Sequence, residues 1–121
     1  MPTRTPLLRI HDMLESIQGI EKAIKGKSYR DYQRSWVLRS AVERGVEIIS
    51  EASRHLDAKL KSAHKDVRWK DIAGIGNILR HDYQRVDGQI IWKAVKNDFP
   101  PLKEALLAMN ASLKTDPEAK K

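Results

Sequence analysis

The stretch "LLRIHDMLESIQGIEKAI", Leu7 to Ile24, decides the structural class of this chain. Thr5 and Pro6 are typical of an N-cap and a first helical residue, and Gly26 is placed to end a helix. Between them, aliphatic residues recur at steps of three and four, the spacing that lines one face of an α-helix: Leu7, Ile10, Leu14, Ile17, Ile20 and Ile24. We therefore predict that the chain begins with a helix that buries one face.

The helical period continues after this segment. Ser28 and Asp31 resemble a capping box at the start of a second, longer helix. A third helix is predicted from about Asp66. The buried face of the second helix is predicted to include Trp36, Val42, Val46, Ile49, Leu56 and Leu60.

Two shorter segments complete the predicted fold. "GQIIWKAVKN" forms a fourth helix capped by Asp87, and Asp98 followed by two prolines marks the start of a fifth. No segment alternates with period two for long enough to form a strand. We predict a single-domain, all-α, antiparallel bundle of about five helices over residues 1–114, and a frayed tail over 115–121. Core packing rather than stacking on bases is the predicted role of Trp36, Trp69 and Trp92.

The composition limits the compartment and the partners. The 121 residues are 40% hydrophobic, enough to bury one core, and no Cys is present to form disulfides or thiolate sites. No apolar run approaches the roughly 18 residues of a membrane span, and the start lacks the apolar core of a signal peptide. We therefore expect a cytoplasmic protein. The net charge of +7 favours a polyanion such as RNA or an acidic protein surface, although an ordinary basic surface explains it equally well.

The stretch "AGIGNILRHDYQRVD" contains the candidate chemistry. Asn77 and His81 are one helical turn apart, and Gly76, Arg80 and Tyr83 form the neighbouring column. A histidine can transfer protons near neutral pH, and an arginine matches a phosphate's geometry. Together they could cleave RNA without a metal, with a base activating a ribose 2′-hydroxyl and a cation stabilising the developing charge. The alternative is that these groups are only the polar end of a surface helix.

Other kinds of site find little support. "GIGNIL" matches only two glycines of a dinucleotide-binding loop, and no strand precedes it. No cofactor is therefore predicted. The histidines lack the spacing of a metal site, so no metal is predicted, and surface positions are expected for His11, His55 and His64.

Longer stretches resemble a known family. "WKDIAGIGNILRHDYQRVDGQIIWKAVKNDFPPL", Trp69 to Leu102, is similar to the signature half of the HepT-like family of the HEPN superfamily. "LLRIHDMLESIQGIEKAIKGKSYRDYQ" resembles the family's opening helix and turn, and "AVERGVEIISEASRHL" its second helix. The resemblance covers nearly the whole chain.

This resemblance implies a function and partners. Members of the family are helical homodimers whose motif helices face each other, and they resemble toxin ribonucleases paired with an MNT-type nucleotidyltransferase antitoxin. His81 matches the catalytic histidine and Asn77 the polar residue of the motif. Tyr83 matches the tyrosine that the partner can modify with AMP, which would place phosphate charge beside the site.

The chain departs from the family pattern at two positions. The motif has an arginine separated from its histidine by four to six intervening residues, but the corresponding positions 74–76 hold Gly74, Ile75 and Gly76. Ser50 also replaces the family's usual glycine in "IISEA". One interpretation is that Arg80, which lies one turn beyond Gly76 and about 40° away around the helix, leans back to supply the charge. The other is that the active site has decayed.

Three functions follow from these observations. The leading one is a metal-independent RNA endonuclease, the toxin of a HepT/MNT-type pair, with His81 as acid and base, Arg80 as the cation and Tyr83 as the regulatory site. The alternative is a catalytically inactive HEPN-fold module that dimerises and engages a nucleotidyltransferase or RNA. A third is a nucleotide-binding subunit that assists a transferase.

Overall fold

The computed structural model describes residues 5–81 and 88–115, and the side chains of Arg80, His81 and Thr115 lie outside this description. Within the described residues every regular element is helical, which confirms the predicted all-α class. The elements in chain order are α1 (Pro6–Ile24), α2 (Tyr29–Arg34), α3 (Trp36–Arg54), α4 (Ala58–Ser62), α5 (Trp69–His81), α6 (Gly88–Lys93), the π-helical turn η1 (Ala94–Asp98) and α7 (Phe99–Thr115).

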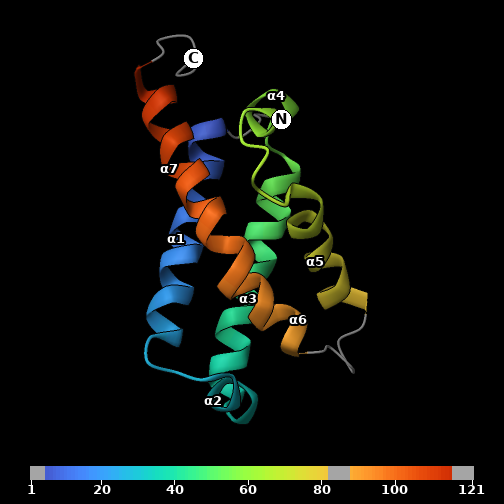
Figure 1. Ribbon diagram of the computed structural model, residues 1–121. Helices are drawn as coiled ribbons and strands as arrows, with labels where there is room; N and C mark the ends of the chain where they lie inside the picture. The colour runs from blue at the N-terminus through green and yellow to red at the C-terminus, as the bar shows by residue number, and fades with distance from the viewer. Residues whose placement is uncertain (1–4, 82–87, 116–121) are drawn as a thin grey trace.

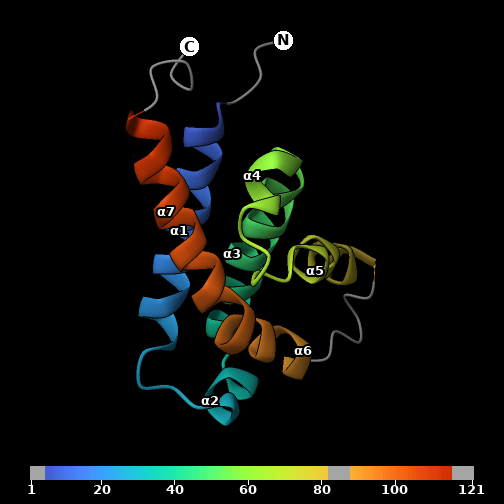
Figure 2. The same ribbon diagram turned by 45° about the horizontal axis from the view of Figure 1, so that its top comes forward.

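Helix α3 is the centre of the arrangement. It packs against α1 on one side and against α5 on another, and α7 packs against α1. Helices α1 and α7 run antiparallel and side by side, whereas α5 leans away from the long axis of the bundle (Figures 1 and 2). This arrangement places one face of α5 against α3.

The start of the fold follows the predicted caps. The hydroxyl of Thr5 accepts from the Leu8 amide at 3.3 Å, and Gly26 adopts a left-handed φ of 73° in the turn after α1. The Asp31 amide donates to the Ser28 hydroxyl at 3.1 Å, and the Ser28 amide donates to the Asp31 carboxylate at 2.8 Å. This reciprocal pair forms the predicted capping box.

The second helix is interrupted where a continuous one was predicted. Ser35 ends α2, and its hydroxyl accepts from the Leu38 amide at 3.0 Å, which makes it the N-cap of α3. The break changes the helical phase, so Trp36 falls in the first turn of α3 and is 72% exposed. The prediction that Trp36 packs in the core is therefore wrong.

The other two tryptophans pack as predicted. Trp69 and Trp92 are partly buried against the core. The Trp69 indole donates to the carbonyl of His64 at 3.0 Å, which fixes the start of α5. The Trp92 ring lies with its centroid 5.5 Å from that of Tyr32 and 6.0 Å from that of Tyr29, so it joins α6 to α2.

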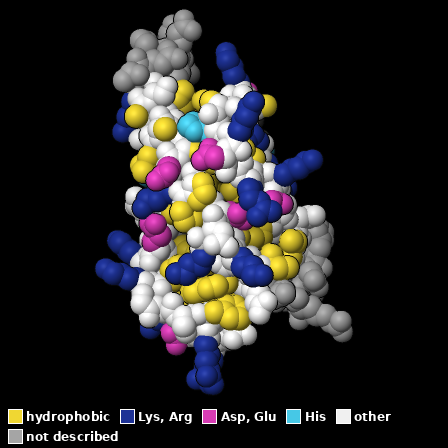
Figure 3. Space-filling model, in the orientation of Figure 1, with side chains coloured by type: hydrophobic (Ala, Val, Ile, Leu, Met, Phe, Trp, Pro, Cys, Tyr) yellow, Lys and Arg dark blue, Asp and Glu magenta, His cyan; other side chains and the backbone are white. Residues whose placement is uncertain are grey.

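The core is formed mainly by one face of each long helix. Burying one such large side chain stabilises the fold by roughly 1.5–3 kcal/mol. On the surface, basic and acidic side chains are intermixed in Figure 3, in agreement with the scattered basic residues of the sequence. None of the described helices is long and apolar enough to cross a membrane. The most deeply buried side chains include Ile10, Met13, Ile17, Tyr32, Val42, Val46, Ile49, Ile72, Ile91, Leu102 and Leu106.

Candidate functional site

Helix α5 carries the predicted motif and is held on α3 by an apolar face. Ile72, Ile75 and Leu79 on this face are all buried. Asn77 lies on the exposed side of the helix. The motif helix therefore has one side fixed by packing and one side open to a ligand or partner.

A polar contact joins the middle of α5 to α3. Ser50 of α3 is fully buried, and its hydroxyl donates to the carbonyl of Ala73 at 2.9 Å. The same hydroxyl accepts from the amide of Gly76 at 3.0 Å. Because both its donor and its acceptor are used, this buried serine carries no unsatisfied polar group.

Gly76 permits the close approach at this contact. A Cβ at position 76 would lie 2.6 Å from Ser50 Oγ and 3.0 Å from Ser50 Cβ. Rotation about the Cα–Cβ bond of Ser50 moves Oγ away but leaves Cβ in place. The two departures from the family pattern, Ser50 and Gly76, therefore touch each other. Gly74 differs, because a Cβ there would meet nothing within 4 Å.

A guanidinium lies beside this contact. Nη2 of Arg54 on α3 lies 3.5 Å from the position that a Cβ at residue 76 would take. Nη1 of Arg54 lies 4.0 Å from the carboxylate of Glu51, which also contacts Nε2 of His55 at 3.1 Å. Glu51 thus forms exposed ion pairs along α3.

The residues predicted from the motif fall at the end of α5. Arg80 and His81 are its last two helical residues, and their side chains lie outside the described atoms. Tyr83 lies outside the described residues altogether. The convergence of these side chains with Asn77 stays a prediction.

Arg54 is the residue that the sequence did not single out. A helical wheel of α5 compares residues within one helix, and Arg54 reaches the motif from a different one. One signal was available: Arg54 follows Ser50 by one turn, and helical side chains lean toward the N-terminus of their helix. A departure at Ser50 therefore pointed to Arg54 as its neighbour.

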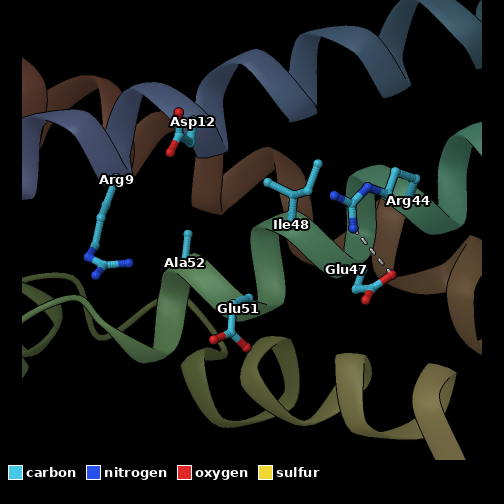
Figure 4. A pocket seen from close by; sticks show the side chains of 7 residues that line it. All are labelled: Arg9, Asp12, Arg44, Glu47, Ile48, Glu51 and Ala52. Atoms are coloured by element: carbon cyan, nitrogen blue, oxygen red, sulfur yellow. Dashed lines mark ion pairs between the residues drawn. The ribbon is translucent and has the colours of Figure 1, made fainter. Parts of the chain in front are cut away.

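A charged hollow of about 300 Å³ lies between α1 and α3. Arg9 and Asp12 of α1 line it from one side, and Glu51 extends toward α5 at its edge (Figure 4). Arg44 and Glu47 form an ion pair at 3.7 Å in its wall. Because three carboxylates and two guanidiniums line this hollow, it does not offer the uniform positive charge that a nucleic acid requires.

A second hollow of about 250 Å³ lies beside α5 and is mainly apolar. Ile78 of α5 and Ile90 of α6 line it and are 37% and 43% exposed. At its rim, Arg68 lies 3.7 Å from Asp98, whose pKa is raised by burial and partly lowered again by this guanidinium. Within the described part of the chain, no group of three or more His, Asp or Glu side chains could hold a metal ion.

Comparison with known proteins agrees with the resemblance of the sequence. Residues 13–109 match the family model described as "Ribonuclease HepT-like". A protein of Methanocaldococcus jannaschii named a "Putative RNase" is 36% identical over 95 residues, which cover 78% of this chain and 87% of that protein. The "Probable ribonuclease HepT" of Thermococcus cleftensis is 34% identical over 94 residues, covering 78% and 86% of the two chains.

A third relative extends the match. The "Putative RNase" of Caldanaerobacter subterraneus is 33% identical over 101 residues, which cover 84% of this chain and 90% of that one. No solved structure matches the chain. The family model and the relatives both span the helices α3 and α5 that form the Ser50–Gly76 contact. The chain therefore belongs to the HepT-like ribonuclease family.

Proposed function

We propose that the protein is a metal-independent RNA endonuclease and the toxin of a HepT/MNT-type toxin–antitoxin pair. The observation that carries the proposal is the family match over residues 13–109, which includes the whole motif helix. The net charge of +7 supports a polyanionic substrate such as RNA. A cytoplasmic location suits a ribonuclease of this kind.

In the proposed reaction His81 transfers the protons. Its imidazole removes the proton of a ribose 2′-hydroxyl, and the 2′-oxygen attacks the adjacent phosphorus. The bond to the 5′-oxygen breaks, and this oxygen takes a proton from the imidazolium, leaving a 2′,3′-cyclic phosphate and a 5′-hydroxyl. Arg80 stabilises the charge that develops on the phosphate, and Asn77 binds the substrate beside it.

Two partners belong to the proposal. The exposed Ile78 and Ile90 support a homodimer, because burial against a second copy would cover the apolar hollow beside the motif helix. An MNT-type nucleotidyltransferase would act as the antitoxin. It would transfer AMP to Tyr83 and so repel RNA from the site.

One observation favours the alternative of a catalytically inactive binding module. Gly76 is buried against Ser50 and supplies no guanidinium where the family's motif has arginine. In this alternative the chain still dimerises and binds a nucleotidyltransferase or RNA.

Cleavage of total cellular RNA in EDTA tests the proposal. The parent protein should cleave, and His81→Ala, prepared in the same way, should not. Cleavage by neither protein, from material shown by mass spectrometry to lack AMP, would support the inactive module. Co-expression with an MNT-type nucleotidyltransferase should add one adenylyl mass to the parent and none to Tyr83→Phe.

A further inference from the structure

In the proposed reaction Arg80 supplies one cation, and position 76, near which the family's motif has arginine, supplies none. Attack of the 2′-oxygen adds negative charge to the phosphate, and donors aimed at that charge are usually the largest contribution to the rate. Gly76 has no side chain to offer, and its face of α5 is packed on α3. A cation at this point can therefore come from α3.

Helix α3 presents Arg54 at this place. Arg54 follows Ser50 by one turn, and its side chain leans back over Ser50 toward α5. Its Nη2 lies 3.5 Å from the point where a side chain at position 76 would begin. The space that Gly76 leaves is thus bordered by the guanidinium of Arg54.

The charge of Arg54 is available to a ligand. Its side chain is 37% exposed, and Glu51 lies 4.0 Å from Nη1, the outer limit of an ion pair. Exposed pairs of this kind are weak, so a phosphate can compete for the guanidinium. Arginine can bind such a phosphate through two parallel hydrogen bonds, which lysine cannot.

A purely structural role for Arg54 is the competing explanation. A cation in the last turn of α3 interacts favourably with the helix dipole and with Glu51. Both effects stabilise the fold and neither involves RNA. The orientation of Nη2 toward α5 fits a ligand-binding role better, because the dipole and Glu51 both belong to α3.

We propose that Arg54 binds the RNA phosphate in place of the arginine that the family's motif has near position 76. This inference rests on the proposed ribonuclease function. It also explains why Ser50 and Gly76 depart from the family pattern together. The side chain of an arginine at position 76 would need the space beside Gly76, and Ser50 and the Arg54 guanidinium lie at the edge of that space.

The test compares four variants for cleavage of a labelled RNA oligonucleotide in EDTA. Arg54→Ala should lower the cleavage rate by about 100-fold, the usual loss for one donor to a developing oxyanion, and Arg54→Lys should retain an intermediate rate. Adding Ser50→Gly and Gly76→Arg to Arg54→Ala should recover part of the rate, because α5 then supplies the guanidinium. Lys22→Ala, which removes one exposed positive charge from α1, is the matched control and should stay within about twofold.

A binding measurement separates failure of this inference from failure of the proposed function. A single-stranded DNA of the same sequence lacks the attacking 2′-hydroxyl and so reports phosphate binding alone. Loss of one phosphate contact should reduce the slope of log affinity against log salt by about 0.7 in Arg54→Ala. Circular dichroism establishes that each variant is folded before it is compared.

The outcomes lead to different conclusions. If the parent cleaves RNA and Arg54→Ala cleaves at the same rate, the inference about Arg54 is overturned and the proposed function stands. If the parent does not cleave, the proposed function fails, and the DNA measurement decides the role of Arg54. A reduced salt slope then supports phosphate binding by Arg54, and an unchanged slope overturns it.

Discussion

The contact between Ser50 and Gly76 predicts that one substitution will have opposite effects in two backgrounds. Gly76→Ala adds a Cβ 2.6 Å from Ser50 Oγ and 3.0 Å from Ser50 Cβ. In the parent this overpacking should cost roughly 2 kcal/mol. In a Ser50→Gly background both atoms are absent, and the remaining neighbour, Nη2 of Arg54 at 3.5 Å, is at an ordinary van der Waals distance.

The net effect includes the helix propensity of the new residue. Alanine in a helix interior is about 1 kcal/mol more favourable than glycine. Gly76→Ala should therefore destabilise the parent by about 1 kcal/mol and stabilise Ser50→Gly by about the same amount. The coupling between the two positions is then about 2 kcal/mol, well above the additivity expected for independent sites.

Urea denaturation of the four proteins measures this coupling. All are compared at one protein concentration, because a dimer's stability depends on concentration. Gly74→Ala serves as the control, since a Cβ there meets nothing within 4 Å and should stabilise both backgrounds alike. The same sign for Gly76→Ala in both backgrounds would refute the close contact.

Three further predictions concern the stability of the fold around the site. Burial raises the pKa of Glu43 above its ordinary value of 4.5. The protonated side chain therefore contributes favourably to folding below about pH 4.5, and this contribution is lost as the pH rises through the folded-state pKa. Glu43→Gln should raise the Tm at pH 7 and leave it unchanged below about pH 4. Ile49→Ala empties a fully buried position and should cost 2–5 kcal/mol in urea denaturation, whereas a loss under about 1 kcal/mol would contradict the packing. Trp69→Phe removes the hydrogen bond to His64 and should cost about 1 kcal/mol, while Trp36→Phe on the surface should cost almost nothing.

The sequence predicted the parts of the fold that local physics determines. The caps at Thr5 and Ser28 depend on hydrogen bonds over three residues, so they can be recognised in the sequence alone. Ser35 is a cap of the same kind, but it sits inside a stretch whose apolar spacing also fits a continuous helix. The periodicity predicts one helix through the break and places Trp36 on its buried face, whereas the side chain is exposed.

The candidate site also has one part that the sequence alone predicts and one part that depends on how the helices pack. The residues on α5 could be named from spacing and resemblance, because the motif lies within one helix. Spacing identifies Arg54 only as a neighbour of Ser50 on the same helix, because its relation to Gly76 depends on how α3 and α5 cross. Helical wheels describe one helix, whereas the spacing between two helices is set by the smallest residues at their contact.

The environment of Gly76 bears on whether the site has decayed or been rearranged. A decayed position that carries no function is under no constraint to keep charge beside it, and an apolar side chain on α3 would pack there at lower cost than a buried hydroxyl. Position 76 instead faces Ser50, which uses both of its hydrogen-bonding capacities, and Arg54, whose guanidinium lies 3.5 Å from the missing Cβ. The two polar groups that α3 places against this glycine favour rearrangement. The rescue of Arg54→Ala by Ser50→Gly with Gly76→Arg is expected only of a rearranged site, because in a decayed one the position of the guanidinium would not affect the rate.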